Sequence, residues 1–175
     1  MRKAVILAAL LLAACGPAQG GTAGTITAAL NVNLLSDDFP PVLPAALTCD
    51  GAGRPPAMTW SDPPPTTRSL VVELVDTEAP SGIFAHWLVY DIPSGARGLT
   101  PPLPASATEG RNGYGATGYG PICPPHGQTH IYLLTVYATT LDPTLPGGLT
   151  RTQLDDRIRP AVIGMGQLEG TYSRR

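Results

Sequence analysis

The amino-acid composition predicts a mainly β protein with one folded domain. Proline and glycine each occur 20 times in 175 residues, which argues against long helices because both residues are poor helix formers. Hydrophobic residues make up 43% of the chain, which argues against disorder. A chain of this length is one ordinary domain and can bury a core without the help of metals.

The first 14 residues have the pattern of an export signal. Arg2 and Lys3 supply the positive start, and residues 4–12 supply a short apolar core. Residues 12–15 form a small-residue cleavage site that ends in a cysteine. This run resembles a bacterial lipoprotein signal, which implies cleavage before Cys15 and diacylation of its thiol. An ordinary secretory peptide and a chance match are the alternatives, since the apolar core is too short to span a bilayer as a helix.

The lipoprotein resemblance divides the chain into three parts. Residues 1–14 are the signal peptide, residues 15–25 are a lipidated tether rich in Gly and Ala, and residues 26–175 are the folded domain. We expect an exported protein that its N-terminal lipid anchors to a bacterial membrane, on the periplasmic or cell-surface side. The formal net charge of −2 provides no basic surface for nucleic acid, so we expect no nucleic-acid partner.

The first half of the domain is predicted to contain two strands separated by a turn-rich stretch. Partial alternation of apolar residues indicates a first strand over residues 26–35. Residues 48–60 are rich in turn residues and end in Trp60, which we expect to be buried. β-branched and leucine residues run almost without interruption over residues 69–75, as in a strand covered on both faces. This strand places Asp76 at its end.

The next predicted strand carries a histidine. Alternation over residues 85–92 places His86 on the same face as Leu88 and Tyr90. Residues 96–115 contain several prolines and glycines and are predicted to form a long loop. A loop of that length in a compact domain is usually functional or mobile.

The last third of the chain is predicted to contain the clearest strand, one short helix and a final strand. Residues 129–139 alternate so that His130 and Tyr132 share a face. Residues 150–153 fit a capping box, in which a Thr oxygen and a Gln side chain satisfy exposed amides at a helix start. A later proline limits this helix to a few turns, and residues 167–172 are consistent with a last short strand.

Two stretches concentrate the residues that can carry chemistry. Residues 118–132 combine glycines, prolines, a thiol and two histidines, as expected of a stiff loop whose backbone can approach a ligand. Residues 76–80 offer two acids and are followed by His86. Two histidines near acids can bind an anion, shuttle a proton or hold a metal ion.

Together these stretches resemble the paired signatures of the phosphatidylethanolamine-binding protein family, whose bacterial branch is often labelled Raf-kinase-inhibitor-like. Residues 48–60 resemble a third phrase of the same family. The resemblance implies an antiparallel β-sandwich with short peripheral helices. It also implies a small pocket that binds an anion, such as phosphate or a phosphorylated head group, with no turnover and no cofactor. The matching pocket positions are Asp76, Glu78, His86, Gly120, Pro121, His130 and Tyr132.

These positions give the implied pocket a coherent chemistry. Imidazole N–H groups, the Tyr132 hydroxyl and loop amides can donate to phosphate oxygens, while the acids orient the imidazoles or bind an ammonium group. Thr77 and Glu78 stand where Pro and Asp are commoner in the family, and residues 121–122 stand where Gly-Pro is commoner. Ile131 stands where Arg is commoner, and because that cation is lost we expect weaker affinity for anions here.

Two other functions are open alternatives. The inhibitor members of the family imply a protein that modulates a protease or kinase, with residues 96–115 as the contact surface, although the sequence identifies no protein partner. A hydrolase that uses the same pocket would need a metal held by histidines and a carboxylate, or Cys123 as a nucleophile. Gly-x-Ser-x-Gly and Cys-x-x-Cys motifs are absent, so we expect neither an enzyme nor a metal site. Cys49 and Cys123 form an even pair that permits a disulfide in an exported protein, but the sequence does not tell the distance between them.

Overall fold

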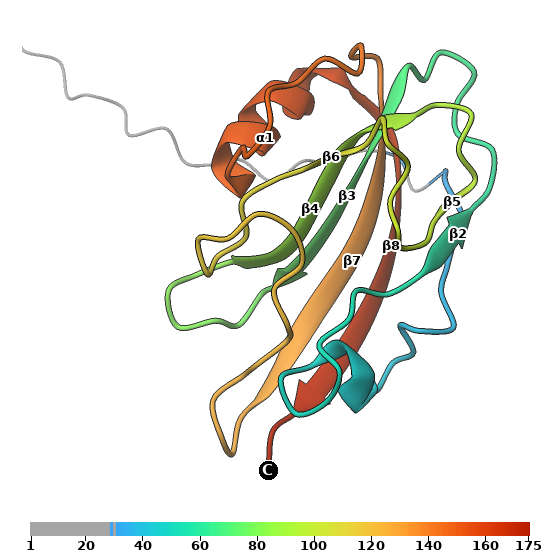
Figure 1. Ribbon diagram of the computed structural model, residues 1–175. Coiled ribbons are helices and arrows are strands. Elements are labelled where there is room, and N and C mark those ends of the chain that lie inside the picture. Colours follow the sequence, from blue (N-terminus) through green and yellow to red (C-terminus); the bar gives the residue numbers. More distant parts are fainter. Residues whose placement is uncertain (1–28, 30) are drawn as a thin grey trace, which may run out of the picture.

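The computed structural model describes residue 29 and residues 31–175, and this part of the chain forms two antiparallel sheets and one short α-helix (Figure 1). The predicted antiparallel β-sandwich with short peripheral helices is therefore confirmed. The predicted signal peptide of residues 1–14 and the tether of residues 15–25 lie outside the described residues. So do residues 26–28 and 30, which belong to the first predicted strand.

A five-stranded sheet forms the centre of the molecule (Figure 1). Its strand order is β6-β4-β3-β7-β8, and each neighbouring pair is antiparallel. Strand β3 lies in the middle of the sheet and is buried along its whole length, as its unbroken apolar run predicts. The strands are β3 (Ser69–Asp76), β4 (Phe84–Pro93), β6 (Thr108–Glu109), β7 (Thr129–Thr139) and β8 (Val162–Ser173).

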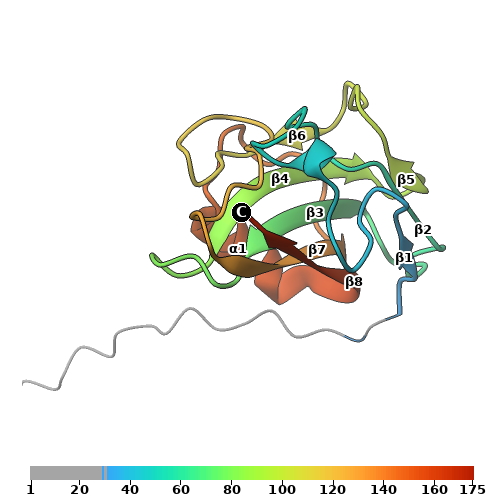
Figure 2. The same cartoon turned by 90° about the horizontal axis from the view of Figure 1, so that it is seen from below.

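A small sheet covers one face of the large sheet and a helix covers the other (Figure 2). The small sheet has the order β1-β2-β5, with antiparallel pairs. Its strands are β1 (Leu34–Leu35), β2 (Met58–Trp60) and β5 (Gly98–Leu99). The helix is α1 (Arg151–Ile158), and the short 3-10 turns are η1 (Ala45–Leu47) and η2 (Arg159–Ala161).

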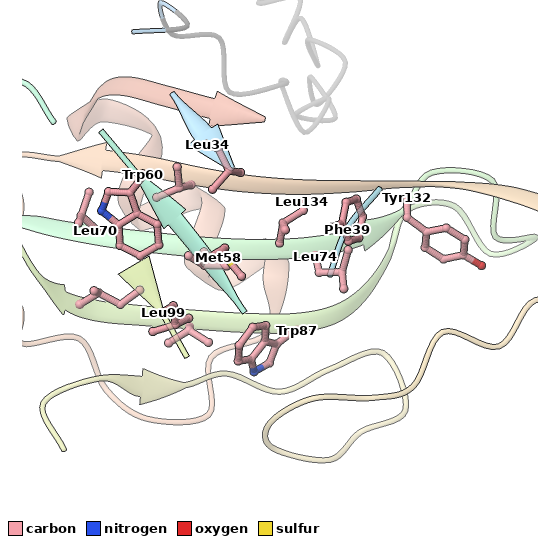
Figure 3. Close-up of a cluster of buried hydrophobic side chains, with 14 of the residues drawn as sticks. Leu34, Phe39, Met58, Trp60, Leu70, Leu74, Trp87, Leu99, Tyr132 and Leu134 are labelled. Carbon is pink, nitrogen blue, oxygen red and sulfur yellow. The ribbon is translucent and has the colours of Figure 1, made fainter. Parts of the chain in front are cut away.

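Apolar side chains fill the space between the two sheets (Figure 3). Leu70 and Leu74 of β3 belong to the same buried cluster as Met58 and Trp60 of β2 and Leu99 of β5. Trp60 is 4% exposed, which confirms the expectation that it is buried. Each side chain of this kind contributes roughly 1.5–3 kcal/mol when it is fully buried. Because the strands of the small sheet are only two or three residues long, this packing holds them more than their ladder hydrogen bonds do.

Helix α1 packs on the opposite face of the large sheet through residues one turn apart. Its Leu154 and Ile158 are buried against Val71 of β3, which alternates with the residues that face the small sheet. The predicted capping box starts this helix: the Thr150 hydroxyl accepts from the amide of Gln153 at 3.4 Å, and the Gln153 side-chain oxygen accepts from the amide of Thr150 at 3.0 Å. The helix therefore begins where its sequence predicts.

Strand β8 is longer than the predicted strand over residues 167–172. The prediction missed its first half, which is rich in glycine. Glycine is depleted in strands, so local propensity does not reveal this half. Close packing requires the glycines. A Cβ atom at Gly166 would lie 2.3 Å from the carbonyl oxygen of Val32, and one at Gly170 would lie 2.5 Å from a methyl carbon of Leu43.

Two other sequence predictions need correction. The predicted first strand is short: among its described residues, only Leu34–Leu35 pair as a strand, and Val32 instead donates its amide to Met165 at 3.2 Å. The predicted long loop over residues 96–115 contains β5 and β6, and Arg111 forms an isolated bridge with Thr117. These residues lack an apolar pattern of their own and become ordered by pairing with neighbouring strands.

Candidate functional site

A cavity of about 230 Å³ opens where β3 ends and β4 and β7 begin. Antiparallel pairing places Asp76, the last residue of β3, opposite Phe84 of β4 and Tyr132 of β7. The two stretches 76–80 and 118–132 meet at this cavity. It is lined by Asp76, Ala79, Pro80, Ser81, Phe84, His86, Tyr114, Cys123, Pro124, Pro125 and His130.

Asp76 and His130 form a buried pair at the cavity floor. The Asp76 Oδ2 atom lies 2.7 Å from Nδ1 of His130, and both side chains are almost completely buried. Asp76 Oδ1 accepts from the amide of Glu78 at 2.8 Å, so both carboxylate oxygens have a donor. The second ring nitrogen of His130 lies 3.0 Å from the side-chain oxygen of Gln128. Because an amide can present either its oxygen or its NH₂ group, Gln128 satisfies this nitrogen in either protonation state.

His86 carries the ring nitrogen that is free for a ligand. Its Nδ1 atom lies 2.9 Å from the carbonyl oxygen of Gly120, which can only accept, so Nδ1 carries the proton. Burial lowers the pKa of His86, against the opposing effects of the Gly120 hydrogen bond and the Asp76 charge. The ring is therefore neutral at neutral pH, and its Nε2 atom is a hydrogen-bond acceptor.

A β-bulge turns His86 toward the cavity. Ala85 pairs with Val75, and Trp87 pairs with Leu74, the residue before Val75 in β3. His86 lies between Ala85 and Trp87 and therefore has no direct partner in β3. Such an extra residue bends the strand and changes the direction of a side chain. The expectation that His86 shares a face with Leu88 and Tyr90 is therefore wrong, because those two side chains pack on the helix side of the sheet. His86 instead contacts Tyr132, with ring centroids 5.6 Å apart.

Tyr132 lies behind the cavity floor. The residue is fully buried, and its hydroxyl has no hydrogen-bond partner among the described residues. Figure 3 shows it at the end of the apolar cluster with the hydroxyl pointing away from the aliphatic side chains. Burial, followed by the negative charge of Asp76, raises the pKa of Tyr132, so the phenol stays protonated. Tyr132 supports His86 and does not line the cavity.

The other predicted positions contribute in different ways. Gly120 and Pro121 supply carbonyl oxygens, which accept from His86 and from the Tyr114 hydroxyl, the latter at 3.0 Å. Glu78 contributes only its backbone amide, because its side chain is exposed and does not line the cavity. The residues brought together at the cavity are thus the acid Asp76 and two of the three histidines of the chain.

Sequence reasoning missed the aromatic wall of the cavity. The ring centroid of Phe84 lies 5.0 Å from the ring centroid of His86 and 4.8 Å from that of Tyr114. Gly120 makes room for Tyr114, since a Cβ atom there would lie 2.6 Å from the tyrosine ring. A tyrosine inside a glycine-rich loop was the available signal, because glycines such as Gly120 leave room for its ring, which is 54% exposed at the cavity wall.

Cys49 and Cys123 form a disulfide in the structure, with Cα atoms 5.4 Å apart. The bond joins the loop after η1 to the residues that line the cavity, and the amide of Cys49 also donates to the carbonyl of Ile122 at 2.9 Å. With its sulfur in a disulfide, Cys123 has no thiol to act as a nucleophile. The bond therefore holds one wall of the cavity in place.

The described residues contain no cluster of three or more His, Cys, Asp or Glu side chains that is suited to a metal ion. His126 precedes His130 by four residues, but it is exposed and its Nδ1 atom bonds to the carbonyl of Arg175 at 2.8 Å. In the same part of the chain, no helix combines the length and the apolar character that crossing a membrane requires. Two wider hollows of about 360 and 560 Å³ adjoin β1, and neither has a histidine among its lining residues.

Comparisons with known proteins agree on one family. The family model described as phosphatidylethanolamine-binding protein matches residues 37–173. A UPF0098 protein of Aquifex aeolicus is 35% identical over 139 residues, which cover 75% of this chain and 81% of the relative. A UPF0098 protein of Methanothermobacter thermautotrophicus is 33% identical over 140 residues, which cover 75% of this chain and 91% of the relative.

Two solved structures have the same fold. A phosphatidylethanolamine-binding protein homologue from Chlamydia trachomatis aligns with a TM-score of 0.75 at 29% identity, covering 82% of this chain and 98% of the other. Escherichia coli YbcL aligns with a TM-score of 0.77 at 25% identity, covering 82% of this chain and 99% of the other. The similarity thus extends over nearly the whole length of both relatives.

Proposed function

The chain belongs to the phosphatidylethanolamine-binding protein family, and we propose that it holds a small oxyanion, inorganic phosphate or a phosphorylated head group, in the cavity at the end of β3. The observation that carries this proposal is the gathering of His86 and His130 around one cavity with the buried acid Asp76. Imidazoles and a carboxylate of fixed orientation are groups that recognise an oxyacid by hydrogen bonds.

The rim of the cavity supports a ligand with a short organic part. Pro80, Phe84, Pro124 and Pro125 provide apolar surface around the polar floor. Binding sites commonly combine an apolar lining with a few oriented polar groups. A phosphorylated head group would place its phosphate at the histidines and its methylene groups along this rim.

The same groups favour binding without turnover. A nucleophile needs a neighbouring base with a free nitrogen. Asp76 and Gln128 occupy both ring nitrogens of His130, and Cys123 is in a disulfide. His86 keeps one free nitrogen, but its ring hydrogen bond is to the Gly120 carbonyl, and no hydrogen bond among the described residues joins it to Ser81, the one serine that lines the cavity.

A titration of the purified full chain with inorganic phosphate and phosphoethanolamine tests the proposal, by calorimetry and by amide chemical shifts. We expect saturable binding, shifts confined to residues 76–86 and 114–130, and loss of binding in His86→Ala. His126→Ala is the matched control, because this histidine is exposed and does not line the cavity. No binding at millimolar ligand, or equal effects of the two substitutions, would contradict the proposal and direct attention to protein partners of residues 96–115.

We also propose that the chain is exported and anchored to a bacterial membrane through a lipid on Cys15, on the periplasmic or cell-surface side. The support is the charged start, apolar core and cleavage pattern of residues 1–15. Mass spectrometry of the mature protein tests it: we expect an N-terminal cysteine that carries acyl chains, and Cys15→Ala should release the protein from membranes. Mature protein that begins elsewhere and carries no lipid would contradict the anchor.

A further inference from the structure

We propose that the cavity recognises a proton on its ligand: His86 Nε2 accepts a hydrogen bond from a P–O–H group, so the site selects phosphate and phosphate monoesters over oxyanions that carry no proton. This inference rests on the proposed function and names the ligand class of the same cavity. It excludes sulfate, and it excludes phosphodiesters, which include every phospholipid whose phosphate also carries an alcohol head group.

The first argument is the locked orientation of His86. Its Nδ1–H donates to the carbonyl of Gly120 at 2.9 Å, and its own carbonyl accepts from the amide of Gly120 at 2.8 Å. The ring of Tyr114 packs against Gly120, and the Tyr114 hydroxyl holds the next carbonyl, that of Pro121, at 3.0 Å. Rotation of the imidazole would leave the Gly120 carbonyl without this donor, so the ring presents Nε2 as its free nitrogen. Burial, which lowers the pKa of His86, keeps this nitrogen unprotonated near pH 7.

The second argument is the charge of the groups that face His86. From β3 it faces Asp76, and from β7 it faces His130 and the buried phenol of Tyr132. From the glycine-rich loop it faces Tyr114, a neutral phenol whose pKa is raised by burial. The lining residues include no lysine or arginine.

One cation whose charge acts on the cavity wall is already paired. Arg174 acts on the pKa of Tyr114, but its guanidinium is paired with Asp50 at 3.1 Å. An anion in the cavity therefore meets one buried carboxylate, one imidazole lone pair and no guanidinium among the residues that line the cavity. An anion without a proton is repelled by the first two groups. An oxyacid with one O–H donates a hydrogen bond to this lone pair. A buried acceptor discriminates between ligands in this way, because a ligand without a donor leaves the acceptor unpaired.

Oxyanions differ in whether one of their oxygens carries a proton. Inorganic phosphate keeps at least one O–H across the neutral range, and a phosphate monoester keeps one below its second pKa of about 6. Sulfate has nearly the same size and shape as phosphate but has no proton at neutral pH, and a dialkyl phosphate has none at all. The proton, and neither size nor shape, is what separates these pairs.

Four probes test the inference by calorimetry on the purified full chain at pH 6.0: inorganic phosphate, methyl phosphate, dimethyl phosphate and sulfate. We expect the first two to bind at least tenfold more tightly than the last two. Sulfate within threefold of phosphate would overturn the inference while leaving anion binding intact. Failure of all four probes at millimolar concentration would instead overturn the proposed function, so the two failures are distinguishable.

A substitution and a spectrum test the role of His86 itself. His86→Gln keeps a polar group near the Nε2 position but can donate from its NH₂, so we expect the preference for phosphate over sulfate to fall below threefold. His126→Gln should retain the tenfold preference. Independently of that variant's folding, ¹⁵N shifts of the wild-type ring should show a protonated Nδ1 and a bare Nε2 at pH 7. A protonated Nε2 in that spectrum would overturn the inference.

Discussion

Strand β3 carries two buried acids three residues apart, and they are neutralised in different ways. Asp76 faces the cavity, pairs with His130 at 2.7 Å and accepts a second hydrogen bond from the amide of Glu78. Glu73 alternates to the other face and lies under α1, 3.4 Å from Nε of Arg151. The Arg151 guanidinium also pairs with Asp155 at 3.1 Å.

The Glu73 cluster has two carboxylates for one guanidinium. Glu73 Oε1 and Asp155 Oδ1 have no hydrogen-bond partner among the described residues. Burial, and after it the negative charge of Asp155, raises the pKa of Glu73 well above its usual range despite the nearby Arg151. Burial therefore favours the neutral form of Glu73. The comparison teaches that a carboxyl group at an open cavity is held in place by a hydrogen bond to a histidine, whereas burial in a closed core favours the protonated form.

Loss of the disulfide has the largest expected effect, and its local effect should appear first on the cavity side. Cys49 and Cys123 are separated by 74 positions, and a bond that closes a loop of this length stabilises by about 4 kcal/mol through the unfolded state. The double variant Cys49→Ser, Cys123→Ser should lose this amount in urea unfolding. Hydrogen exchange should accelerate first at residues 119–125. A loss below about 1 kcal/mol, or faster exchange confined to α1, would contradict this prediction.

Replacing the shared cation should be nearly as costly on the helix side. Arg151→Met removes the one cation that Glu73 and Asp155 share, which costs about 3 kcal/mol at pH 7. Arg157→Met is the matched control on the exposed face of α1, with an expected change of about 0.5 kcal/mol or less. Equal losses for the two variants, measured by urea unfolding, would show that the cluster does not depend on Arg151.

The cavity acid should have a smaller effect on stability and a larger one on binding. Asp76→Asn removes the charge that His130 faces but keeps one oxygen as an acceptor, so we expect a loss of about 2 kcal/mol. The exposed Asp62, paired with Arg97 at 2.5 Å, is the control, and Asp62→Asn should cost about 0.5 kcal/mol or less. The preference for phosphate over sulfate should fall only in Asp76→Asn, because the carboxylate charge contributes to the repulsion of an anion without a proton. An unchanged preference in that variant would remove Asp76 from the site.

The proton on Glu73 should appear as a pH dependence. Since its pKa is raised in the folded state, the unfolded chain loses this proton first, near its usual value of 4.5. Wild-type stability should then fall as pH rises from there toward the folded pKa, by at most about 1.4 kcal/mol per pH unit for one proton. Glu73→Gln removes this slope, so its stability relative to wild type should increase between pH 4 and pH 8. Urea unfolding curves that stay parallel to wild type, as expected for the exposed control Glu169→Gln, would contradict the assignment.

Much of the framework followed from local patterns. The apolar run of residues 69–75 predicted a strand buried on both faces and ended at Asp76, and the alternation of residues 129–139 placed Tyr132 and Leu134 on one face. The capping box predicted where α1 starts. These features depend on neighbours a few residues apart, which the sequence shows directly.

Other features depend on contacts between distant segments. The glycines of β8 make sense only beside Val32 and Leu43, and the predicted loop of residues 96–115 is ordered only by the strands it pairs with. At the candidate site, strict alternation placed His86 on the wrong face, because the bulge that turns it is a mismatch in length between β3 and β4. The sequence likewise does not reveal that the Glu78 side chain is exposed.

By itself, the sequence determined that this protein is mainly β, that residues 69–75 form a strand covered on both faces, and that acids and histidines concentrate in and just after two stretches, residues 76–80 and 118–132. Only the tertiary structure decided which nitrogen of His86 is free, that Asp76 is paired with His130, and that Glu73 shares one guanidinium with Asp155. The reason is physical. Strand and helix patterns arise from periodic burial along the chain, whereas protonation and hydrogen bonding depend on which distant atoms come within about 3 Å of each other.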